Sequence, residues 1–70
     1  MSKAAVFTFR EIINTNEVLQ DELRDGASLI DLASRYRIAI TAQDVRGALE
    51  EMRDELAEEE IDWFEAASEE

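Results

Sequence analysis

The chain has almost no helix-breaking residues: its 70 residues include no proline and only two glycines. Apolar residues recur three and four positions apart in four successive stretches, as on one face of a helix. Good cap residues lie between these stretches, including Asn14 to Asn16, Ser28 and Thr41. The sequence therefore predicts an all-α fold, a small bundle of about four helices joined by short loops.

The same signals predict where each helix begins and ends. Ser2 caps a first helix that ends near Asn14, and a short second helix ends at Gly26, where a left-handed residue is favoured. A third helix follows Ser28 and gives way to an extended connector over residues 37–40. The last and longest helix follows Thr41, reaches at least Leu56, and frays or bends around residues 58–60. The predicted core comprises Phe9, Leu23, Leu32, Leu49 and Met52.

Charge divides the chain into two parts. The formal net charge is −11, and residues 50–70 carry eleven of the eighteen carboxylates but only one base, Arg53. Their net charge is therefore −10, whereas residues 1–49, with seven acids and six bases, carry −1. We interpret residues 1–56 as a helical domain and residues 57–70 as an acidic tail that contains a Trp-Phe pair. Such asymmetry indicates an interaction role.

Composition excludes several classes of function. Cysteine and histidine are both absent, which removes thiolate nucleophiles, imidazole bases and N/S-ligated metal sites, so we expect neither an enzyme nor a cofactor. No run of 18 apolar residues occurs and the N-terminus lacks a signal-peptide core, so we expect a cytoplasmic protein. The strong negative charge disfavours nucleic acid and anionic membranes, and it favours a protein partner with a basic surface.

The acidic tail is the predicted partner-binding element. Ile61, Trp63 and Phe64 would supply an apolar anchor, framed by carboxylates that steer the partner: Glu58, Glu59 and Glu60. A helix cannot bury two adjacent aromatics against one neighbour, so one of them should stay exposed. The alternative, in which Trp63 folds back on Leu56, stays open. The secondary partner-binding residues surround the connector: Arg35, Tyr36 and Arg37.

The order of these signals from Ala4 to Leu49 resembles the Nif-eleven family, a small helical domain. Its members are stand-alone proteins associated with nitrogen fixation or leader segments of modified ribosomal peptides. The matching segments are Phe9 with Ile12 and Ile13, residues 16–23, 29–33 and 38–41, and the run from Ala42 to Leu49. The chain departs from the family at Arg37, where glycine is usual. A left-handed turn at an arginine is strained, so the turn is expected to differ there.

The resemblance implies an accessory protein that binds a component of the nitrogen-fixation apparatus. The molybdenum–iron nitrogenase protein, or an assembly or inactive form of it, is the leading candidate. The alternative is a leader-type peptide, or its relic, recognised by a peptide-modifying enzyme. Leader-type members end in a core rich in Cys, Ser or Thr, whereas this chain ends in residues 65–70, Glu-Ala-Ala-Ser-Glu-Glu, so we expect the stand-alone type. An acidic mimic of nucleic acid also fits the charge, but it does not need the Trp-Phe pair.

Overall fold

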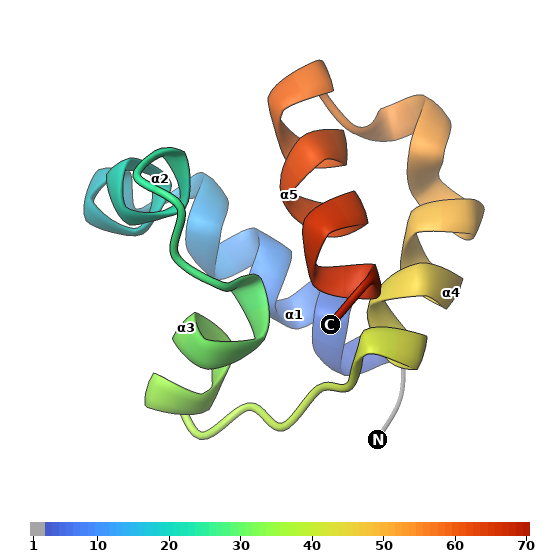
Figure 1. Ribbon diagram of the computed structural model, residues 1–70, viewed down its shortest axis with the longest axis horizontal. Helices are drawn as coiled ribbons and strands as arrows, with labels where there is room; N and C mark the ends of the chain where they lie inside the picture. The colour runs from blue at the N-terminus through green and yellow to red at the C-terminus, as the bar shows by residue number, and fades with distance from the viewer. Residues whose placement is uncertain (1–2) are drawn as a thin grey trace.

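The computed structural model describes residues 3–70, which fold into five α-helices and one short 3₁₀ helix (Figure 1). The described part of the chain contains no strand, and the all-α prediction is confirmed, with one α-helix more than the four expected. The elements are α1 (Lys3–Asn14), α2 (Glu17–Arg24), α3 (Leu29–Arg35), α4 (Ala42–Met52), η1 (Arg53–Glu55) and α5 (Glu58–Ser68).

The helices form two halves in Figure 1. On one side, α4 and α5 run antiparallel to each other and make the most extensive helix–helix contact in the molecule. On the other side lie α2 and α3, and α1 joins the halves because it packs on both α4 and α2. Contact between α3 and α5 completes the bundle. The C-terminal helix therefore packs against both α4 and α3.

The helix starts follow the predicted caps. Asn16 Oδ1 accepts hydrogen bonds from the backbone N–H groups of Val18 and Leu19, at 3.0 and 3.2 Å. The hydroxyl of Ser28 caps α3, and Thr41 and Asp44 form a reciprocal capping box with both bonds at 3.1 Å. These bonds satisfy N–H groups that have no partner inside the helix. The cap predicted at Ser2 lies outside the described residues.

Two helices end with the same backbone turn. Gly26 after α2 and Arg37 after α3 both take positive φ angles, 103° and 61°. In each turn the N–H of the following residue donates to the carbonyl five residues before it. Ala27 donates to Glu22 and Ile38 donates to Ala33, both at 3.0 Å. This is the Schellman arrangement, for which glycine is the favoured residue. The turn at Arg37 is thus left-handed, contrary to the expectation that it would differ.

A single cluster of buried apolar side chains draws on every α-helix. All five residues of the predicted core are buried, with exposed fractions from 0% at Leu32 to 7% at Met52. The prediction of the core is therefore confirmed. Leu56, Phe64 and Ala67 belong to the same cluster, so the C-terminal residues contribute to it as well.

The last predicted helix is wrong in its extent. It ends at Met52, the chain passes through η1, and Leu56 is extended and buried, so the break falls at residues 56–57. Residues 58–60 form the first turn of α5, where three carboxylates face the positive end of the helix dipole. The longest helix is α1, with 12 residues. Residues 57–70, interpreted as a tail, therefore fold mainly as a packed helix.

Candidate protein-binding surfaces

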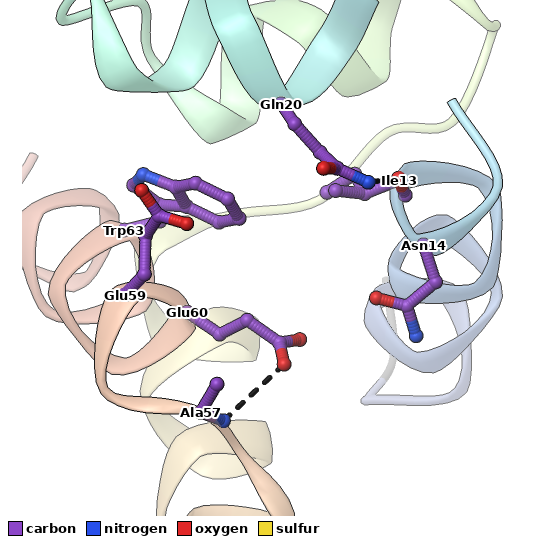
Figure 2. A pocket seen from close by; sticks show the side chains of 7 residues that line it. All are labelled: Ile13, Asn14, Gln20, Ala57, Glu59, Glu60 and Trp63. Atoms are coloured by element: carbon purple, nitrogen blue, oxygen red, sulfur yellow. Dashed lines mark hydrogen bonds between the residues drawn. The ribbon is translucent and has the colours of Figure 1, made fainter. Parts of the chain in front are cut away.

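The N-terminal turn of α5 is tied to α1 by Arg10 and Glu60. Arg10 Nε donates to Glu60 Oε2 at 2.8 Å, and Nη2 donates to Oε1 at 3.4 Å and to the carbonyl of Glu55 at 3.4 Å. The two side chains are only 21% and 14% exposed. This hydrogen bonding with Glu60 raises the pKa of Arg10. Glu60 also accepts from the N–H of Ala57 at 3.3 Å, so its carboxylate is fully engaged (Figure 2).

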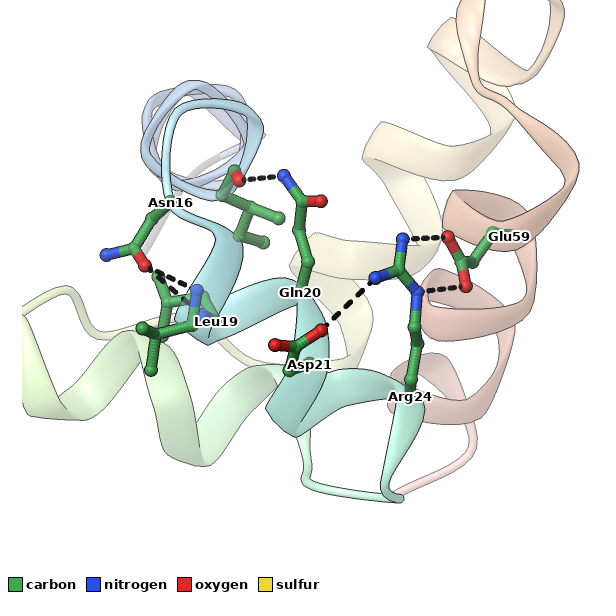
Figure 3. A network of polar contacts seen from close by, with 8 residues as sticks. Asn16, Leu19, Gln20, Asp21, Arg24 and Glu59 are labelled. Atoms are coloured by element: carbon green, nitrogen blue, oxygen red, sulfur yellow. Dashed lines mark hydrogen bonds and ion pairs between the residues drawn. The ribbon is translucent and has the colours of Figure 1, made fainter.

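A second, more exposed pair ties α5 to α2. Arg24 meets Glu59 through two bonds, Nε to Oε2 at 2.7 Å and Nη2 to Oε1 at 2.9 Å (Figure 3). Its remaining nitrogen, Nη1, lies 3.3 Å from Asp21 Oδ1. Hydrogen bonds from the Arg24 guanidinium lower the pKa of Glu59. Because two guanidinium nitrogens of Arg24 bind the two oxygens of Glu59, the orientation of both side chains is fixed.

Between these pairs lies a pocket of about 150 Å³, formed where α1, α2 and α5 meet (Figure 2). The indole of Trp63 forms one wall, and Gln20, which donates to the carbonyl of Ile13 at 2.9 Å, lies on the opposite side. The two carboxylates that line the pocket are those of Glu59 and Glu60. Since arginines already bind both, the pocket offers no free carboxylate to a ligand.

The structure changes the interpretation of the predicted anchor. Phe64 is 1% exposed and belongs to the core, so it is not available on the surface. Ile61 and Trp63 are partly buried against the same core. Of the two adjacent aromatics, then, Phe64 takes the buried position because its side of α5 faces the other helices. Glu58 stays exposed without an ion pair, whereas Glu59 and Glu60 are bound by arginines of the same chain.

Free carboxylates are most frequent on α4, η1 and α5 and at the residue that follows α5. Several acidic side chains there are exposed and make neither an ion pair nor a side-chain hydrogen bond. We call them the acidic face: Glu50, Asp54, Glu55, Glu58, Asp62 and Glu69. Glu51 and Glu65 of the same elements are paired, with Lys3 at 2.8 Å and Arg53 at 3.6 Å. The predicted concentration of acid therefore survives folding as a surface, although not as a tail.

The connector residues lie on the opposite half of the molecule. Arg35 is exposed and pairs with Glu22 at 2.9 Å, and Arg37 is exposed without a partner. Tyr36 is 43% exposed, and its hydroxyl accepts a hydrogen bond from Asn16 Nδ2 at 3.2 Å. Val18 is apolar but 68% exposed. It lies in the first turn of α2, where Leu19 takes the inward position.

Comparisons with known proteins return nothing: no family model, curated protein or solved structure matches this chain. Within residues 3–70, no helix is both long and apolar enough to cross a membrane. The same residues contain no group of three or more acidic side chains arranged to hold a metal ion.

Proposed function

We propose that this chain is a non-catalytic accessory protein that binds a protein partner with a basic surface. The resemblance of residues 4–49 to the Nif-eleven family names the nitrogen-fixation apparatus as the source of that partner. The molybdenum–iron nitrogenase protein, or an assembly or inactive form of it, is the first candidate. The observation that carries the proposal is the acidic face, whose six carboxylates are exposed and unpaired on α4, η1 and α5 and at the residue that follows α5.

The physical support is electrostatic. Like charges three and four residues apart on a helix destabilise it by a few tenths of a kcal/mol per pair, roughly, so the acidic face costs the free protein some stability. A basic partner would relieve this repulsion and would be steered toward the face before contact. The chain's own cations form no ion pair with these carboxylates, because the described basic residues of the same region bind other acceptors: Lys3, Arg46 and Arg53.

The role of the predicted apolar anchor is narrower than the sequence suggested. Trp63 and Ile61 are partly buried, so only a fraction of each side chain is available to a partner. Glu58 and Asp62, one turn apart on α5, are free. We therefore assign the first contact to the carboxylates of the acidic face, and we give Trp63 a supporting role at its edge.

A binding measurement with purified molybdenum–iron nitrogenase protein tests this proposal. The test variant carries Glu58→Gln, Asp62→Asn and Glu69→Gln on the acidic face. The matched control carries Glu11→Gln, Glu17→Gln and Asp31→Asn, which remove the same charge from unpaired acids on α1, α2 and α3. We expect the test variant to associate more slowly than wild type and the control to lie close to wild type, and we expect salt to slow wild type most.

The outcomes separate the partner from the surface. Equal slowing in both variants would mean that net charge alone acts and that the acidic face is not the contact. Failure of wild type to bind the nitrogenase protein at low salt would reject this partner.

A further inference from the structure

We propose that a second surface, formed by Val18, Tyr36 and Arg37, binds a short segment of a partner protein in which an apolar side chain stands next to a carboxylate. We call these three residues the connector patch. It differs from the acidic face in position and in chemistry, and the inference does not depend on the function proposed above. Three features of the patch carry it.

The first feature is apolar exposure. Val18 and Tyr36 are the two large hydrophobic residues that are exposed in the described part of the chain, at 68% and 43%. Asn16 links them, because its amide donates to the Tyr36 hydroxyl at 3.2 Å while its Oδ1 accepts from the N–H of Val18 at 3.0 Å. The Tyr36 ring also rests against Phe9, with the ring centroids 6.0 Å apart. The apolar part of the patch is thus held in place before any partner arrives.

The second feature is an uncommitted cation. Among residues 3–70, Arg37 is the one basic residue whose side chain makes neither an ion pair nor a hydrogen bond, although acids greatly outnumber bases. The other cations bind Glu51, Glu60, Glu59, Glu22, Glu65 and the carbonyl of Ser68. The planar guanidinium of Arg37 is therefore free to take a carboxylate, which arginine binds with two parallel bonds.

The third feature is the backbone of Arg37. Its φ of 61° lies in the left-handed region, which non-glycine residues adopt at a cost. Such conformations are held by their surroundings and cluster at binding sites. In this chain the turn after α3 holds Arg37 in that conformation. Two backbone hydrogen bonds form the turn, from the N–H of Arg37 to the carbonyl of Ser34 and from the N–H of Ile38 to the carbonyl of Ala33, both at 3.0 Å. The guanidinium therefore starts from a fixed point directly after Tyr36.

These features select the occupant. A basic segment would meet the Arg37 charge, whereas a carboxylate would complement it, and an apolar side chain would cover Val18 and Tyr36. A second copy of this chain is disfavoured because two exposed apolar side chains fall far short of the roughly 800 Å² that each partner buries in a stable interface. It would also bring together two chains of net charge −11. A short segment with one anchor and one carboxylate fits both the size and the charge.

The test is a titration of the isotope-labelled chain followed by amide NMR shifts. The probes are the peptide acetyl-Gly-Ser-Leu-Phe-Glu-Ser-Gly-amide and the same peptide with Gln or Lys in place of Glu. We expect saturable shifts at residues 16–19 and 35–38. We also expect the Glu peptide to bind about threefold tighter than the Gln peptide, as for an exposed ion pair. The Lys peptide should bind most weakly of the three.

Two variants with the same change of charge complete the test. In Arg37→Gln the preference for Glu over Gln should vanish, whereas in Arg53→Gln, on η1, it should remain. Val18→Ser should weaken the Glu and Gln peptides equally. The proposal is overturned if millimolar peptide gives no saturable shift, if the shifts map outside the patch, or if Arg37→Gln keeps the preference for Glu.

Discussion

Arg10 on α1 and Glu60 on α5 form the least exposed of the ion pairs described, although 50 residues separate them in the chain. Glu60 also binds the N–H of Ala57, so one carboxylate closes the break after η1 and fixes the start of α5. Arg10 at the same time donates to the carbonyl of Glu55. The pair thus holds the C-terminal helix at the point where the chain turns back toward α1.

This relationship predicts that Arg10→Gln destabilises the fold more than Arg53→Gln. Loss of Arg10 leaves the Glu60 charge partly buried without its partner, which should cost about 1–2 kcal/mol in the free energy of unfolding. The Arg53 pair with Glu65 spans 3.6 Å between half-exposed side chains and should contribute little. Urea unfolding followed by circular dichroism measures both. An equal loss of unfolding free energy in the two variants would contradict the prediction, because the Arg10 pair would then stabilise the fold no more than the exposed Arg53 pair does.

The two adjacent aromatics of α5 should behave differently when truncated. Phe64 is 1% exposed, so Phe64→Ala should cost about 3–5 kcal/mol, a large share of the stability of a domain of this size. Trp63 is only partly buried, and Trp63→Ala should cost clearly less. Thermal unfolding of the two variants gives the comparison. A larger loss for Trp63→Ala than for Phe64→Ala would contradict the packing of α5 described here.

These results explain which parts of the fold the sequence predicts. Caps at Asn16, Ser28 and Thr41 were predicted correctly because each bond joins residues two or three positions apart. The core positions followed from helical spacing, which is also local. The last helix was missed because Glu59 and Glu60 interrupt the apolar stripe. Their partners, Arg24 and Arg10, lie 35 and 50 residues away, and no local pattern reveals them.

The candidate surfaces divide in the same way. Concentration of acid in residues 50–70 is a property of composition, so the sequence located it, but only the fold shows which carboxylates are free. Phe64 looked like a surface anchor because its neighbours are charged, yet its own side of α5 faces the core. Exposure of Val18 could not be deduced, because Leu19 beside it serves equally well as the apolar residue of the first turn.

Acidic pH should weaken the ion pair between Arg24 on α2 and Glu59 on α5. Hydrogen bonds from Arg24 lower the pKa of Glu59 below its ordinary value of 4.5, so the folded state binds this proton less readily than the unfolded chain. The stabilisation is therefore present above the ordinary pKa and is lost as the pH falls through the lowered one. Glu59→Gln should be less stable than wild type at neutral pH, and the difference should vanish in acid.

The comparison requires a control because acid also relieves the repulsion within a chain of net charge −11. Glu58→Gln removes the same charge from the neighbouring carboxylate, which has no ion pair. Thermal unfolding midpoints of the three proteins, measured from pH 7 down to acid, separate the two effects. If Glu58→Gln shows the same loss at neutral pH, the pair with Arg24 is not its source.

Replacement of Arg37 by glycine should stabilise the protein. Its left-handed conformation costs about 1 kcal/mol that glycine does not incur, so Arg37→Gly should raise the free energy of unfolding by a similar amount. Arg37→Ala removes the charge but keeps the strain, and it should show no such gain. The converse change, Gly26→Ala, should destabilise the protein through backbone strain, because φ at Gly26 is 103°. A steric clash is not the cause, since apart from its chain neighbours no atom lies within 4 Å of the added Cβ.

The same series connects stability with the connector patch. If Arg37 is kept for its charge, Arg37→Gly should be more stable than wild type and should at the same time lose the preference for the Glu peptide over the Gln peptide. Urea unfolding and the peptide titration are carried out on the same protein samples, so the two effects are directly comparable. A variant that gains stability and keeps the preference would show that the guanidinium has no part in binding, and the strain at this turn would then need another explanation.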